Sequence, residues 1–228
     1  MIIDLLRHGE PVGGQRYRGH GCDDPLSSRG WAQMWSAVGI ENSSSATVVE
    51  GAQRPHAEVS GGGDPMTQWS MVITSPMRRC REFSEAFCRA AGLVSPVVID
   101  DLREVGFGVW EGHTREAIER DRGDEYYRFC ADPEHARPPG AEPLAEFRRR
   151  VAAALTQIEA MWVARAEGSN EGPILVVAHA GTIRALLGQV LDLPHAALYR
   201  IDCRYASLSR ITCTRDRGWR VGFVNRVS

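Results

Sequence analysis

The sequence lacks the features that would place it in a membrane, on nucleic acid or among disulfide-rich secreted proteins. No apolar run approaches the length of a membrane-spanning helix, and the formal net charge of −2 gives no general attraction to nucleic acid or anionic membranes. The six cysteines are scattered without a CxxC pair, so neither a zinc site nor a disulfide framework is suggested. The start, MIIDLLRHGE, carries Asp4 inside a very short apolar stretch, unlike a secretory signal peptide. We therefore expect a cytoplasmic protein with reduced thiols, and neither nucleic acid nor a membrane as partner.

What the sequence does contain is an alternation of short strand patterns with helical patterns. Its 228 residues, 43% hydrophobic and 25% charged, are enough to bury one full core. Strands are predicted at MIIDLL, MVITS, VVID and ILVVAH, and helices at PMRRCREFSEAFCRAA and GTIRALLGQVL. This alternation predicts an α/β protein with a mostly parallel sheet. The segments ASLSRITC and WRVGFVN add late strands, the last of them antiparallel.

Two stretches interrupt the alternation within this single predicted domain, residues 1–228. Residues 41–69 are rich in Ser, Gly and small polar residues, which predicts a mobile surface insertion. Residues 113–170 contain two long helical patterns joined by the Pro- and Gly-rich segment ADPEHARPPGAEP. We expect this second stretch to form a helical subdomain beside the sheet.

Side chains that can bind anions, act as nucleophiles or transfer protons follow several of the predicted strands. In an open α/β sheet, ligands bind outside the carboxyl ends of the strands, so residues at these ends are brought together. Cations, two imidazoles, a carboxylate and helix N-termini in one place describe a phosphate site with a nucleophile and an acid. Each residue alone would be a weak signal, and their joint placement carries the prediction. The residues are Arg7 and His8 after the first strand, Arg78 or Arg79 after the second, His179 after ILVVA, and Glu104 in the loop DDLREVGFGVWEG.

Other polar and aromatic residues have simpler interpretations. The remaining histidines follow no strand end, and three adjacent arginines, Arg148, Arg149 and Arg150, are most simply a charged helix face. Trp110 is either a core residue or a cleft-lining aromatic, and the sequence leaves both open. The remaining histidines are His20, His56, His113, His135 and His195.

Five motifs together resemble the histidine phosphatase superfamily, also called the phosphoglycerate mutase-like family. They are LLRHGEP, DDPLSSRGWAQM, TSPMRRCRE, LREVGFGVWEG and VVAHAGTIRALLG, in matching order over nearly the whole chain. RHGEPVGGQRYRGHGCDDPLSSRGWAQM, FGVWEGHT and PPGAEPLAEFRRRV are similar in particular to the α-ribazole phosphatase branch. The chain departs from the family pattern in its long segment 41–69, in Ala180 where glycine is common, and in His20 where glutamine is frequent. The resemblance implies a three-layer α/β/α sandwich.

The resemblance also implies a role for each candidate residue. His8 would be the nucleophile, since a largely neutral imidazole can attack phosphorus without a separate base. Glu104 would protonate the leaving alcohol and later accept a proton from water. The second arginine of the RR pair aligns with the family pattern SPLxRA, which favours Arg79 over Arg78. The phosphoryl oxygens would be bound by Arg7, Arg79 and His179, and further substrate contacts are expected from Arg18, Gly19, His20 and Trp110.

The implied function is hydrolysis of a small phosphorylated metabolite through a phosphohistidine intermediate, with α-ribazole 5′-phosphate or cobalamin 5′-phosphate as the expected substrate. Neither a cofactor nor a metal is expected, because no HxH, HExxH or paired-carboxylate spacing accompanies the two histidines. A broad-specificity phosphatase and a phosphoglycerate mutase-type enzyme are the alternatives within the enzyme class. The mutase is less favoured because no extra Lys or Arg cluster stands beside the motifs. A catalytically idle regulatory domain and a metal-dependent hydrolase are the alternatives of other classes, and the sequence leaves open whether the protein is a monomer or a homodimer.

Overall fold

A computed structural model describes residues 1–39, 69–165 and 172–227, and shows one six-stranded mixed sheet in the order β3-β2-β4-β1-β5-β6. The four strands β3, β2, β4 and β1 pair in parallel, whereas β5 pairs antiparallel with both β1 and β6. The predicted late antiparallel pairing is therefore confirmed, and it includes β5 as well as the last strand. The strands are β1 Ile2–Arg7, β2 Met71–Thr74, β3 Val97–Val98, β4 Ile174–Ala178, β5 Leu208–Thr214 and β6 Gly218–Arg226.

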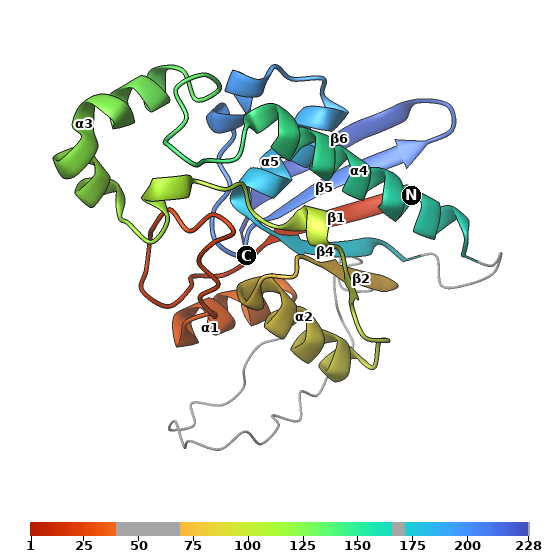
Figure 1. The fold of residues 1–228 in the computed structure, drawn as a ribbon. Helices are drawn as coiled ribbons and strands as arrows, with labels where there is room; N and C mark the ends of the chain where they lie inside the picture. Colours follow the sequence, from red (N-terminus) through yellow and green to blue (C-terminus); the bar gives the residue numbers. More distant parts are fainter. Residues whose placement is uncertain (40–68, 166–171, 228) are drawn as a thin grey trace.

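Helices cover both faces of the sheet, which confirms the three-layer α/β/α prediction (Figure 1). Alternate residues of β1 enter different cores because successive side chains of a strand point to opposite faces. Ile3 and Leu5 pack with α4 and α5, and Leu6 packs with α1 and α2. The helices are α1 Ser28–Ala37, α2 Arg78–Ala91, α3 Arg115–Ala131, α4 Leu144–Val163 and α5 Ala180–Val190, with short 3-10 turns at Asp100–Leu102, Gly108–Trp110 and His195–Arg200.

The segment expected to form a helical subdomain divides into two parts. Helix α4 belongs to the sandwich itself, because Phe147, Val151 and Ile158 lie in the same core cluster as strands β1 and β4. Helix α3 lies to the side of the sheet, beyond its carboxyl ends (Figure 1). Only α3 and the irregular residues that follow it form an addition to the sandwich.

One buried charge holds the sheet to the segment before β2. Asp4, fully buried in β1, accepts two hydrogen bonds from Arg210 of β5 at 2.7 and 2.9 Å and one from Trp69 Nε1 at 2.8 Å. Trp69 is itself buried in the core, so the last residue of the expected insertion 41–69 is part of the fold. The rest of that predicted insertion lies outside the described residues. Within the described part of the chain, no helix is long and apolar enough to cross a membrane.

Candidate active site

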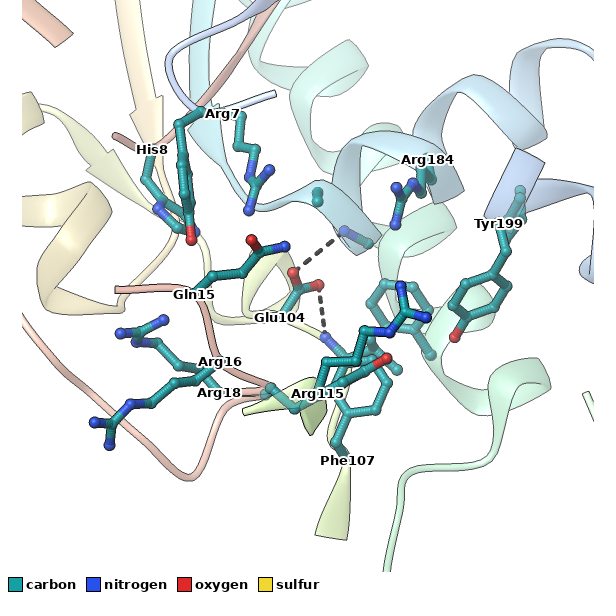
Figure 2. A pocket seen from close by; sticks show the side chains of 18 of the residues that line it. Arg7, His8, Gln15, Arg16, Arg18, Glu104, Phe107, Arg115, Arg184 and Tyr199 are labelled. Carbon is teal, nitrogen blue, oxygen red and sulfur yellow. Dashed lines mark hydrogen bonds between the residues drawn. The ribbon is translucent and has the colours of Figure 1, made fainter. Parts of the chain in front are cut away.

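The carboxyl ends of the parallel strands bring most of the predicted residues to one cavity. Arg7 at the end of β1 pairs in register with Ala178 at the end of β4, so His8 and His179 follow neighbouring strands. Their rings lie 5.1 Å apart between centroids. Arg7, His8, Arg79 and Glu104 line a cavity of about 530 Å³, shown in Figure 2. The predicted convergence of these four side chains is thus present in the structure.

His8 is held with one ring nitrogen free for chemistry. Its Nδ1 lies 2.7 Å from the carbonyl oxygen of Gly9, which can only accept, so Nδ1 carries the proton and Nε2 keeps a lone pair. Burial, with the charges of Arg79 and Arg7, lowers the pKa of His8 well below its ordinary value, which keeps the imidazole neutral. A glycine is required at position 9, since a Cβ there would lie 2.3 Å from the carbonyl oxygen of Gly30 in α1.

Arg79 is buried and Arg7 is partly buried, and both guanidinium groups have hydrogen-bonding capacity left over. Arg7 Nη1 donates to the carbonyl of Cys203 at 2.5 Å, and Arg79 donates from Nη1 to Cys22 and from Nη2 to Gly19 at 2.8 and 2.9 Å. In each of them the Nε is buried without a hydrogen-bond partner among the described residues. An unpaired buried donor is costly, and an anionic ligand would satisfy it with a strong charge-assisted bond.

The choice of Arg79 over its neighbour agrees with the geometry. Arg78 is exposed, and its Nε pairs with Glu82 of the same helix at 2.7 Å. Arg79 is 1% exposed and lines the cavity. Only the second arginine of the pair can therefore serve a ligand in the cavity.

Glu104 presents a half-buried carboxylate to the cavity. Its Oε1 accepts from the backbone N–H of Val105 at 2.9 Å, and its Oε2 accepts from the N–H of Gly181 at 3.2 Å (Figure 2). Gly181 belongs to the first turn of α5. The two amide bonds fix the direction of the carboxylate beside the N-terminus of that helix.

His179 lies next to His8, with the ring centroids 5.1 Å apart, but does not line the cavity. It is fully buried at the N-cap of α5, and its Nε2 lies 2.7 Å from the Oγ of Ser75, a residue of the motif TSPMRRCRE that was not among the candidates. Burial, and then the charges of Arg79 and His8, lower its pKa well below the ordinary value. The expected hydrogen bond from His179 to a phosphoryl group stays a prediction.

The four residues expected to make further substrate contacts, Arg18, Gly19, His20 and Trp110, lie in different places. Arg18 and Gly19 line the cavity, and Arg18 is fixed by an ion pair with Asp24 at 2.9 Å.

Trp110 does not line the cavity. Its side chain is fully buried against Tyr17, Tyr126 and Phe129, and its Nε1 donates a hydrogen bond to Glu125 at 2.6 Å. Of the two interpretations left open for Trp110, the structure therefore supports the core residue, and the expected substrate contact is corrected. His20 also lies outside the cavity lining, with Nδ1 3.2 Å from the carbonyl oxygen of Glu104.

The expectation that no further cationic cluster accompanies the motifs is wrong. Arg16, Arg115 and Arg184 also line the cavity, and they come from the loop after β1, from α3 and from α5 (Figure 2). Arg16 and Arg184 lie inside two of the quoted stretches, RHGEPVGGQRYRGHGCDDPLSSRGWAQM and VVAHAGTIRALLG, and Arg115 directly follows FGVWEGHT. They are far apart in the sequence, so they form no visible cluster there, and the fold brings them to one cavity. Arg184 follows Ala180 by four residues, so both lie on one face of the helix. The sequence contains no lysine, so the positively charged side chains that line the cavity, histidine aside, are all arginines.

The interpretation of Arg148, Arg149 and Arg150 as one charged helix face is also wrong. Arg149 is exposed, but Arg148 donates to the carbonyl of Leu193 at 2.9 Å, and Arg150 is 9% exposed and paired with Glu142 at 2.7 Å. Three consecutive residues of a helix point about 100° apart, so they cannot share one face.

The histidines that follow no strand end take no part in the cavity where they are described. His113, His135 and His195 are absent from its lining, and His195 pairs with Glu134 at 2.7 Å. His56 lies outside the described residues. Over residues 1–39, 69–165 and 172–227, no group of three or more His, Cys, Asp or Glu side chains is arranged to hold a metal ion.

The chain matches the family described as the histidine phosphatase superfamily (branch 1) over residues 65–226. It is 33% identical over 224 residues to the bifunctional protein Rv2228c of Mycobacterium tuberculosis, covering 97% of this chain and 53% of that protein, so it spans about half the length of this relative. It is 27% identical over 208 residues to the adenosylcobalamin/alpha-ribazole phosphatase of Escherichia coli, covering 89% of this chain and 86% of that protein. The solved structure of a mycobacterial glucosyl-3-phosphoglycerate phosphatase gives a TM-score of 0.77 at 22% identity, covers 100% of this chain and 99% of that chain, and shows the shared fold.

Proposed function

The chain belongs to the histidine phosphatase superfamily, and from this premise we propose that it is a phosphomonoesterase in which His8 takes a phosphoryl group from the substrate and passes it to water. The observation that carries this proposal is the hydrogen bond between His8 Nδ1 and the carbonyl of Gly9, which leaves Nε2 as the nucleophilic atom. The unpaired Nε–H groups of Arg7 and Arg79 supply donors for the phosphoryl oxygens.

In the first step, the lone pair of His8 Nε2 forms a bond to phosphorus while the bond from phosphorus to the substrate's alcohol oxygen breaks. Glu104, in its protonated form, gives its proton to that oxygen, and the neutral alcohol leaves. The arginines stabilise the charge on the transferring group and hold it in line with the attacking nitrogen. The products of this step are the alcohol, phosphohistidine and a carboxylate at Glu104.

In the second step, a water molecule attacks the phosphorus of phosphohistidine. The Glu104 carboxylate takes a proton from this water as the new P–O bond forms and the N–P bond breaks. His8 returns to its neutral form and Glu104 to its protonated form, so the cycle consumes one water and releases one phosphate. None of these steps calls on a metal ion, and we propose that activity persists in the presence of a chelator.

For the substrate, we propose α-ribazole 5′-phosphate or cobalamin 5′-phosphate. The adenosylcobalamin/alpha-ribazole phosphatase of E. coli, which is similar to this chain over most of both proteins, supports this choice. The cavity of about 530 Å³ is much larger than a phosphoryl group, and Tyr17, Phe107 and Tyr199 contribute aromatic walls. Such walls can contact the faces of a base in a nucleoside-like alcohol.

A second substrate class is favoured by a specific observation, the additional arginines of the cavity. Arg16, Arg115 and Arg184 would attract an alcohol that carries a carboxylate or a second phosphate, as phosphoglycerate-type substrates do. The same feature would suit a mutase, which must keep an acidic substrate bound while phosphohistidine is present. The proposed substrate and this second class therefore differ in the charge that the leaving alcohol carries.

Steady-state kinetics with a chelator present test the proposal. We expect wild-type protein to release phosphate from p-nitrophenyl phosphate and His8→Ala to lose this activity. Unchanged turnover in His8→Ala would refute the proposed nucleophile, and activity that requires an added divalent ion would refute the metal-free mechanism. Binding of phosphoesters without turnover would indicate an idle binding domain.

The substrate is decided by kcat/KM on α-ribazole 5′-phosphate, 3-phosphoglycerate and simple sugar phosphates. A large preference for the first supports the proposed substrate, and similar values for all indicate a broad phosphatase. Arg184→Met should then lower kcat/KM for 3-phosphoglycerate more than for α-ribazole 5′-phosphate, whereas Arg149→Met, at an exposed position of α4, is the matched control and should change neither. Interconversion of phosphoglycerates without net phosphate release would indicate a mutase.

A further inference from the structure

The backbone that carries Glu104 is bound by side chains from two helices, Arg150 in α4 and Thr182 in α5, whose Oγ1 lies 3.2 Å from the carbonyl oxygens of Leu102 and Arg103. Arg150 in α4 donates from Nη1 to the carbonyl oxygens of Asp101 and Arg103, both at 2.7 Å, and from Nη2 to the carbonyl oxygen of Glu104 at 3.0 Å. Beyond the short 3-10 turn at Asp100–Leu102, this segment belongs to no helix or strand that would satisfy these carbonyls. The guanidinium of Arg150 therefore supplies hydrogen bonds to three of them that a neighbouring strand would otherwise provide.

Glu142 completes this arrangement from the other side. Its two oxygens accept from Arg150 Nε at 2.7 Å and Nη2 at 2.8 Å, and Oε2 also accepts from the backbone N–H of Gly106 at 3.1 Å. Burial raises the pKa of Glu142, but the hydrogen bonds and charge of Arg150 outweigh it and hold the pKa below its ordinary value. The ionised Arg150–Glu142 pair thus contacts the loop on both sides of the Glu104 side chain.

All the donors of Arg150 are used, and none is directed to the cavity. A guanidinium has five N–H groups, and the five contacts above account for them. Its Cζ also lies 4.7 Å from the centroid of the Phe147 ring. Neither Arg150 nor Glu142 is among the residues that line the cavity.

We propose that Arg150, oriented by Glu142, is a positioning residue for proton transfer, which fixes the backbone of residues 101–106 so that the Glu104 carboxyl group meets the leaving oxygen. This inference rests on the proposed function, in which Glu104 is the proton donor. A proton donor must lie within hydrogen-bond reach of the oxygen it serves, and a misplacement of about 1 Å can cost about 10²-fold in rate. Arg7 and Arg79, the proposed donors to the phosphoryl oxygens, belong to β1 and α2, and their hydrogen bonds go to the carbonyls of Cys203, Cys22 and Gly19 and not to the Arg150–Glu142 pair.

The test is Arg150→Lys, because lysine keeps the charge but has three donors on one nitrogen and cannot reach five acceptors in a plane. The quantity to measure is kcat/KM for an alkyl phosphate and for p-nitrophenyl phosphate, which covers the steps up to release of the alcohol. We expect about a 10-fold to 100-fold loss with the alkyl phosphate, which needs the proton, and less than about a 3-fold loss with p-nitrophenyl phosphate, whose leaving group does not. Arg149→Lys, at the exposed neighbour, is the matched control and should leave both values unchanged.

A merely structural role predicts a different result. Equal losses for both substrates, or no loss for either, would overturn the positioning role. Should Arg150→Lys fail to fold, the double variant Arg150→Met, Glu142→Leu removes the buried charges together, a replacement that proteins often tolerate. The same split between the two substrates is expected for it, and its absence would likewise overturn the proposal.

Trapping the phosphoenzyme of the wild-type protein with radiolabelled p-nitrophenyl phosphate separates this inference from the function on which it rests. If the wild type forms no phosphohistidine, the proposed function fails whatever the variants do. If phosphohistidine forms and Arg150→Lys keeps the wild-type dependence on the leaving group, only the role of Arg150 fails.

Discussion

Substitution of Gly181 by alanine should displace the proposed proton donor without removing it. A Cβ at position 181 would lie 2.3 Å from Glu104 Oε1, whereas ordinary contacts begin at about 3.4 Å. The clashing atom ends a flexible side chain, so the carboxylate can yield by moving about 1 Å. Moving also breaks its hydrogen bond from the N–H of Gly181, now 3.2 Å long.

The expected loss follows from this displacement. A shift of about 1 Å in a positioned catalytic group can lower the rate about 10²-fold, equivalent to about 2.7 kcal/mol of transition-state free energy. Gly181 lies inside α5 with a backbone conformation open to other residues, so alanine should itself favour the helix by about 0.5–1 kcal/mol. The variant should therefore lose activity without a comparable loss of stability.

The assay compares kcat/KM for an alkyl phosphate and for p-nitrophenyl phosphate, with urea unfolding measured on the same preparation. Gly181→Ala should lose about 10²-fold with the alkyl phosphate and less than about 3-fold with the aryl phosphate. Gly123→Ala in α3, where an added Cβ meets only Tyr127 at 3.8 Å, is the control and should match the wild type. Wild-type activity of Gly181→Ala on both substrates, or equal losses on both, would refute the assignment of Glu104.

Three further outcomes follow from the same structure. Arg79→Ala should lower kcat/KM by about 10²-fold for alkyl and aryl phosphates alike, while Arg78→Ala should change neither, and steady-state kinetics on both variants checks this. The pKa of His8 is lowered, so NMR titration of its ring should give a midpoint well below about 6.5. As the pH is lowered from about 7 to 5, His8 binds a proton in the unfolded chain but not in the folded chain. The free energy of unfolding, measured in urea, should therefore fall over this pH range. Asp4→Ala should reduce the free energy of unfolding by about 2–3 kcal/mol, because it removes the acceptor of Trp69 and the partner of Arg210, and no loss in urea unfolding would contradict this.

The residues at strand ends could be predicted because parallel pairing fixes where they meet. Once β1 and β4 are recognised as neighbours, Arg7, His8 and His179 must lie at one edge of the sheet, whatever the loops do. Glu104 was selected in the same way, from the loop DDLREVGFGVWEG that follows the predicted strand VVID, and the family pattern distinguished Arg79 from Arg78. These assignments depend on topology and on local sequence, and both are readable without coordinates.

The residues that the sequence did not reveal depend on contacts between distant segments. Arg115 reaches the cavity only because α3 lies beyond the carboxyl ends of the sheet, and the orientation of that helix has no signature in its own sequence. Arg150 was misinterpreted because a run of three arginines suggests one charged helix face, whereas the helical geometry directs Arg150 inward to carbonyls of the Glu104 loop. Trp110 was ambiguous because an aromatic residue in a loop can face a core or a cleft with the same neighbours in sequence.

The most direct test of the proposed chemistry is a rapid-quench experiment with radiolabelled aryl phosphate, followed by peptide mapping of the labelled protein. The proposed mechanism predicts one phosphoryl group on His8 within the first turnover, stable in base and labile in acid, and no label in His8→Ala. Label on another residue, or full turnover in a His8→Ala protein that never becomes labelled, would contradict it.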